Sequence, residues 1–203
     1  MSEPHRAAPA MGIWEFSSIA AGITVGDAIA KHAPVSAITT GTVHPGHYLV
    51  LVAGDLASVT VAADVVSDIA SESLTDGLVL PDIDPSVADA LLIKAGPVQT
   101  SGEAVGVVET ATVPAAIEGA DAAVKDSPVA LAIIRLADGL GGKAYFVIDG
   151  TVGDVESSVA AAVDRCGERL VGATVIPQLT DGIRTDLGLS SEFGATVVDG
   201  GSS

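Results

Sequence analysis

The chain has 203 residues, of which 48% are hydrophobic and only 3% aromatic, so a sizeable core must be built from small aliphatic side chains, in one domain or two. Its formal net charge is −17, with 9 Lys and Arg against 26 Asp and Glu, which argues against the clustered basic surface that binds nucleic acid. The longest apolar run is far shorter than a membrane span and the first residues lack the apolar stretch of a signal peptide, so we expect neither insertion nor export.

In chain order, the first half predicts short apolar strands that alternate with amphipathic helices. The first helix is expected to end before Pro34, because a residue that precedes proline avoids the helical conformation. The second helix has its apolar groups at helical spacing. The expected elements are a strand at 12–16, a helix at 23–32, strands at 35–40 and 48–53, a helix through Val59, Ala63, Val66 and Ala70, a strand closing on Pro81, and a short helix at 86–92.

The second half predicts the same string of elements. Its first helix is expected to end just before Pro128, and its second helix again shows helical spacing of apolar groups. The expected elements are a strand at 105–110, a helix at 117–126, strands at 129–134 and 144–148, a helix through Val155, Val159, Ala162 and Cys166, a strand closing on Pro177, and a short helix at 181–187.

An internal repeat connects the two halves and is the strongest signal in the sequence. Up to the first of the paired strands the offset is 94 residues, and beyond the turn it is 96, so two extra residues belong to that turn in the second copy. The order β-α-β-β-α-β is the split βαβ arrangement, which predicts two tandem α/β (α+β) domains with antiparallel sheets. The coinciding pairs include Gly12/Gly106, Glu15/Glu109, Ile23/Ile117, Asp27/Asp121, Lys31/Lys125, Gly54/Gly150, Glu72/Glu168 and Pro81/Pro177.

The sequence offers little for catalysis. The four His have no counterparts in the other copy, so no Ser-His-Asp set can be built, and we expect no catalytic residue and no metal site. Glu15 and Glu109 recur without a His, Lys or metal that recurs with them, which favours a structural hydrogen-bonding role. Cys166 falls on the apolar stripe of its helix and is interpreted as a small buried hydrophobic residue.

Together these residues carry a resemblance to the bacterial microcompartment shell domain. Each copy shows an initial glycine and glutamate (Gly12, Glu15), a D-A-x-x-K motif, a glycine loop before a strand that ends in glycine, and a closing proline. The pattern occurs twice in the non-permuted order, so the chain resembles the tandem-domain shell proteins. We expect the first domain at 12–96 and the second at 104–188, with disordered tails at 1–11 and 189–203.

The resemblance implies a structural role in the cytoplasm. Tandem relatives form homotrimers that imitate hexagonal disks, and the disks tile with other shell proteins, hexamers and pentamers, into the wall of a protein organelle. The hairpin loop lines a central pore for small metabolites. The pore-lining residues implied here are His44, Pro45 and Gly46 in one copy and Gly139, Leu140 and Gly141 in the other.

The same resemblance assigns Lys31 and Lys125 to the tile edge, where such lysines lie across the boundary between two disks. Relatives often place Arg after the closing V-I-P; here Asp82 and Gln178 stand in those places, so edge packing differs. The loop Cys that holds an iron–sulphur cluster in some relatives is missing, and no cofactor is expected. The alternatives are a trimeric small-molecule sensor built from tandem split βαβ domains, and an enzyme whose residues the sequence does not reveal.

Overall fold

Two four-stranded antiparallel sheets form the centre of the computed structural model, which describes residues 10–92, 100–137 and 139–189. Their strand orders are β2-β3-β1-β4 and β6-β7-β5-β8, so each copy has the expected split βαβ topology. The first copy consists of β1 (Ala10–Phe16), α1 (Ile19–His32), β2 (Ala37–Val43), β3 (His47–Gly54), α2 (Leu56–Ala70), β4 (Leu74–Leu80) and α3 (Pro85–Leu92). The second consists of β5 (Ala104–Thr110), α4 (Val113–Asp126), β6 (Ala130–Leu136), β7 (Ala144–Gly150), α5 (Val152–Cys166), β8 (Leu170–Pro177) and α6 (Asp181–Leu189).

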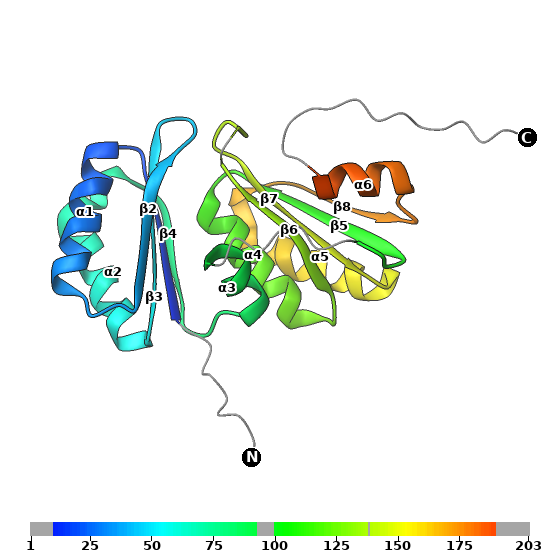
Figure 1. Cartoon of the computed structure of the whole chain (residues 1–203), viewed down its shortest axis with the longest axis horizontal. Helices are drawn as coiled ribbons and strands as arrows, with labels where there is room; N and C mark the ends of the chain where they lie inside the picture. Colours follow the sequence, from blue (N-terminus) through cyan, green and yellow to red (C-terminus); the bar gives the residue numbers. More distant parts are fainter. Residues whose placement is uncertain (1–9, 93–99, 138, 190–203) are drawn as a thin grey trace, which may run out of the picture.

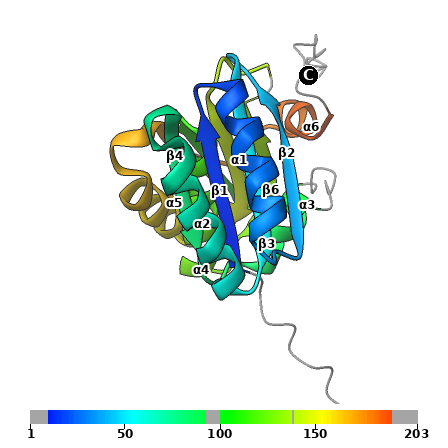
Figure 2. The ribbon, with the colours of Figure 1, turned by 90° about the vertical axis from the view of Figure 1, so that its left-hand side faces the viewer.

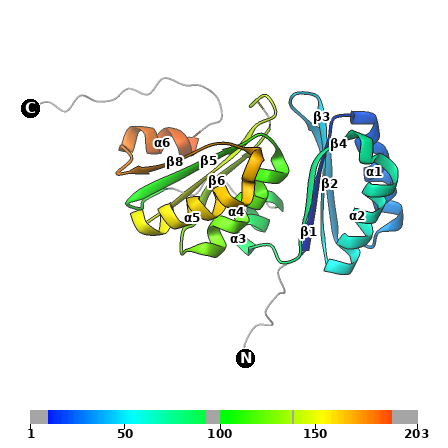
Figure 3. The same cartoon turned by 180° about the vertical axis from the view of Figure 1, so that it is seen from behind.

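The helices cover the sheets in layers. In the first domain α1 and α2 lie together on one face of the sheet, as the view onto that side shows (Figure 2). The opposite face turns towards α3 and α4, so the second domain packs against the first sheet (Figures 1 and 3). In the second domain α4 and α5 cover one face, while Leu187 of α6 packs with Val105 and Val147 on the other.

The central strand β1 shows why the two domains form one core. All seven of its residues are buried, although successive side chains of a strand point to opposite faces. Trp14 and Phe16 pack under α1 and α2. Met11 and Ile13 point the other way and join a cluster with Val113 and Ile117 of α4. The junction between the domains is therefore a hydrophobic core in its own right.

The first helix of each copy begins four residues earlier than the sequence predicts. The helices were expected to begin at Ile23 and Ile117, whereas they begin at Ile19 and Val113. The cause is an N-cap: the Ser18 hydroxyl accepts the Ala21 N–H, and Thr112 accepts that of Ala115. Several strand ends also differ from the predicted ranges, by one to three residues.

The structure confirms where the repeat gains its two residues. Thr42 pairs with Tyr48 as Leu136 pairs with Ala144, so the offset changes from 94 to 96 within the hairpin turn. A bulge between Leu131 and Ile133 also distorts the second hairpin. The expected tails at 1–11 and 189–203 lie outside the described residues, except that Ala10 and Met11 belong to β1 and Leu189 to α6.

Candidate functional site

The two hairpin loops that the sequence assigns to a pore lie at one end of the molecule, side by side (Figures 1 and 3). His44, Pro45 and Gly46 form the exposed tip between β2 and β3. Gly46 has a φ of 99°, and Gly139 and Gly141 in the other loop have φ of 74° and 64°, a region that glycine enters without the steric cost of a Cβ. Leu140, between the two glycines, is half-buried.

The loops also touch each other across the domain boundary. The Gly139 N–H donates to His44 Nδ1 over 3.5 Å. A Cβ on Gly142 would lie 2.8 Å from Pro45 Cδ, so only glycine allows this close approach. The two loops that contain the six residues expected to line a pore therefore lie in contact, although they are about 95 residues apart in the sequence.

His47 is separate from His44, because its ring turns to the sheet. His47 Nδ1 lies 2.8 Å from Glu15 Oε1, and the second oxygen of Glu15 accepts the Val113 N–H at 2.9 Å. In the second copy Lys143 stands at the position of His47 and contacts Glu109 at 2.8 Å. The interpretation that no His or Lys recurs with the two glutamates was wrong, because the recurrence is one of position and of contact with the glutamate rather than of residue type.

A second polar group fixes the domain junction. Arg169, after α5, donates to both oxygens of Asp76 on β4 at 3.3 and 3.4 Å, and to Glu118 of α4 at 2.6 Å. The Thr112 hydroxyl donates to the same Asp76 carboxylate. The side chains of Arg169, Asp76 and Glu118 are only 13–31% exposed. Their mutual pairing offsets the free-energy cost of removing these charges from water. Sequence reasoning missed this group because the first copy has no counterpart.

The two lysines assigned to a tile edge differ in their surroundings. Within the described residues, Lys31 pairs with Asp27 of its own helix alone, at 2.5 Å, and is 64% exposed. Lys125 pairs with Asp121 at 2.7 Å and also donates to the carbonyl oxygen of Asp82, which belongs to the first domain. Lys125 therefore connects the domains while its side chain stays 40% exposed.

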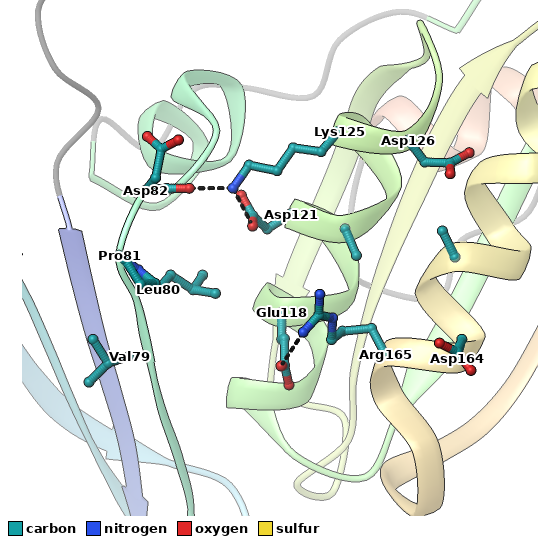
Figure 4. Close-up of a pocket in the computed structure, with 12 residues that line it drawn as sticks. Val79, Leu80, Pro81, Asp82, Glu118, Asp121, Lys125, Asp126, Asp164 and Arg165 are labelled. Carbon is teal, nitrogen blue, oxygen red and sulfur yellow. Dashed lines mark hydrogen bonds and ion pairs between the residues drawn. The ribbon is translucent and has the colours of Figure 1, made fainter.

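Lys125 borders a groove of about 610 Å³ between the end of β4 and helices α4 and α5 (Figure 4). Its rim is rich in charge, and Figure 4 shows Arg165 turned to Glu118 across it. The Ser157 and Ser127 hydroxyls donate to Asp126 and hold the pKa of that carboxyl below its ordinary value, so it stays anionic. The groove thus presents an acidic outer surface beside the junction.

Cys166 is buried, as the sequence indicates, at 1% exposure beneath α4. Burial raises the pKa of its thiol from 9.0 to about 11, because the thiolate loses its hydration. We expect Ellman's reagent to leave the folded protein unlabelled at pH 8 and to label one thiol per chain after denaturation. Rapid labelling of the native protein would contradict this placement of the side chain.

The described residues contain neither a cluster of three His, Cys, Asp or Glu suited to a metal ion nor a helix that is long and apolar enough to cross a membrane.

Comparison with known proteins identifies the class first. The BMC domain model matches this chain twice, at residues 10–83 and 104–179, and these spans coincide with the two halves described above. The chain belongs to the bacterial microcompartment shell protein family, of the tandem-domain type.

Particular relatives narrow the comparison. The chain is 42% identical to bacterial microcompartment shell protein PduT of Citrobacter freundii over 171 residues, which cover 83% of this chain and 92% of that protein. A microcompartment protein structure from Desulfitobacterium hafniense superposes with a TM-score of 0.77 and 38% identity, covering 88% of this chain and 99% of that one. A fused permuted shell protein from the RMM microcompartment, 20% identical over 78% of this chain and 81% of its own, has a TM-score of 0.57 and shows the fold alone.

Proposed function

We propose that this protein is a structural, non-catalytic subunit of a microcompartment shell in the cytoplasm, a homotrimeric pseudohexameric tile with a central pore. The observation that carries the trimer is a contrast between repeat positions. Val113 and Ile117 of α4 are fully buried against the first sheet, whereas their counterparts Ile19 and Ile23 of α1 are 38% and 52% exposed. The same apolar helix face is thus covered once within the chain and left open once.

A second copy of the chain supplies the missing cover. Within each chain, α4 packs on the first sheet. The second sheet of another chain is the repeat counterpart of that sheet, so it can pack on α1 in the same way. When the rotation between neighbouring subunits closes, heterologous contacts of this kind generate a ring. Three chains then give six domains, with three internal junctions alternating with three between chains.

The pore follows from the same arrangement. Since the two loops touch across the internal junction, repeating that junction brings three loops with His44, Pro45 and Gly46 and three with Gly139, Leu140 and Gly141 around one axis. Pro45 restricts its backbone and Leu140 adds an apolar side chain. We propose a narrow opening for small polar metabolites, with Lys31 and Lys125 towards the outer boundary, where other shell proteins adjoin.

Mass measurement and electron microscopy test this assignment together. One chain has a mass of 20.0 kDa, so we expect a particle of about 60 kDa in light scattering at micromolar concentration. Because each chain carries a charge of −17, the trimers should repel one another at low salt and associate more readily as salt is added. A stable monomer would contradict the trimer, and a trimer with both loops on its outer rim would contradict the pore.

A further inference from the structure

Two glutamates at equivalent repeat positions have different environments. Glu15 on β1 has a side chain that is 1% exposed, and it lies between His47 and the start of α4. Its Oε2 accepts the Val113 N–H, the first amide of that helix. The first amides of a helix have no partner within the helix and carry partial positive charge, so a carboxylate there is stabilised. Glu15 of the first domain therefore caps a helix of the second.

Glu109 on β5 has half of this arrangement. It pairs across the sheet with Tyr145, as Glu15 pairs with Leu49, so the two glutamates match in register. Lys143 lies 2.8 Å from Glu109 Oε1, at the place where His47 contacts Glu15. The Glu109 side chain is nevertheless 39% exposed, and within the described ranges no hydrogen bond reaches its Oε2.

The complementary half is the start of α1. The Ser18 hydroxyl accepts the Ala21 N–H at 3.3 Å, just as Thr112 accepts that of Ala115 at 3.4 Å. The Ile19 N–H corresponds to the Val113 N–H, and no acceptor for it occurs in the part of the chain that the structure describes. Among the described residues, a carboxylate oxygen and a helix amide are thus left without partners at the two positions that the internal junction joins.

We propose that Glu109 of one chain accepts a hydrogen bond from the Ile19 N–H of a second chain and so caps its α1 helix. This inference rests on the proposed trimer and names the polar contact that orients its subunits. Docking would bury Glu109 as Glu15 is buried, and a buried carboxylate requires both a counter-charge and hydrogen-bond donors. Lys143 is already placed to supply the charge, and the α1 amide supplies the donor.

Three substitutions test the contact in the full-length protein. Glu109→Ala removes the acceptor, and losing a hydrogen bond to a charged group weakens each interface by about tenfold or more. We expect the concentration at which half the trimers dissociate to rise at least about tenfold. Glu109→Gln keeps a neutral acceptor and should have a smaller effect. Glu156→Ala, a control on the exposed surface of α5, should leave dissociation unchanged.

Hydrogen exchange supplies a readout that general weakening would not reproduce. In the parent trimer, the amides at the start of α1 should exchange more slowly than in the diluted monomer. In a Glu109→Ala trimer held together by high concentration, that protection should be lost at Ile19 while the rest of α1 stays protected. If Glu109→Ala matches the parent in both dissociation and exchange, the contact is wrong and the trimer stands. If the parent itself does not form trimers, the proposed function fails first.

Discussion

Ile23→Asp is expected to produce a folded monomer that no longer forms trimers. Ile23 is 52% exposed on α1 of the single chain, so an aspartate there costs the fold about 0.5 kcal/mol or less. In the proposed trimer the same side chain lies under the second sheet of a neighbouring chain. An unpaired carboxylate at that place must give up its hydration, which costs several kcal/mol at each of the three contacts.

Ile117→Asp is the matched control, because Ile117 holds the same repeat position on α4 and is fully buried. Both variants place the new carboxylate four residues before an aspartate, so that small repulsion is common to them. We expect Ile117→Asp to lower the free energy of unfolding by about 4 kcal/mol or more. Sedimentation and thermal unfolding distinguish the two results. Trimers that persist in Ile23→Asp would show that α1 is not the contact surface.

The repeat explains why so much of the fold could be predicted. Two independent copies of one pattern fixed the order of strands and helices, and the shift from 94 to 96 residues placed the insertion in the second hairpin. The helix starts were harder, since Ser18 and Thr112 act as N-caps only through their hydroxyls, and the apolar spacing on which the prediction relied begins four residues later.

The polar contacts could not be predicted, for two different reasons. Glu15 and Glu109 were visible as a recurring pair, but their partners His47 and Lys143 differ in residue type and contact them only when the strands pair. A search for nitrogen-bearing side chains at the 96-residue offset would have found them. Arg169 offered no such signal, because its contacts join the domains in one copy only.

Substitution of the two lysines assigned to a tile edge should change the stability of the fold by different amounts, because their contacts within the chain differ. Lys31→Glu removes an exposed pair within one helix, and such pairs contribute about 0.3–0.5 kcal/mol. Lys125→Glu removes charge-assisted hydrogen bonds to Asp121 and the Asp82 carbonyl and adds a carboxylate beside a buried one. We expect it to destabilise the domain junction by roughly 2–4 kcal/mol.

The edge role is therefore tested most cleanly at Lys31. If this lysine lies across the boundary between tiles, Lys31→Glu should keep the trimer and its melting temperature but abolish sheets or tubes in negative-stain micrographs, alone or with a co-expressed single-domain shell protein. Ala160→Asp, on the exposed surface of α5, adds negative charge at a position where the first copy already has Asp64, and it should tile like the parent. Since the trimer and the fold are expected to be retained, loss of tiling in Lys31→Glu could be ascribed to neither, whereas tiling at the parent level would exclude this lysine from the edge.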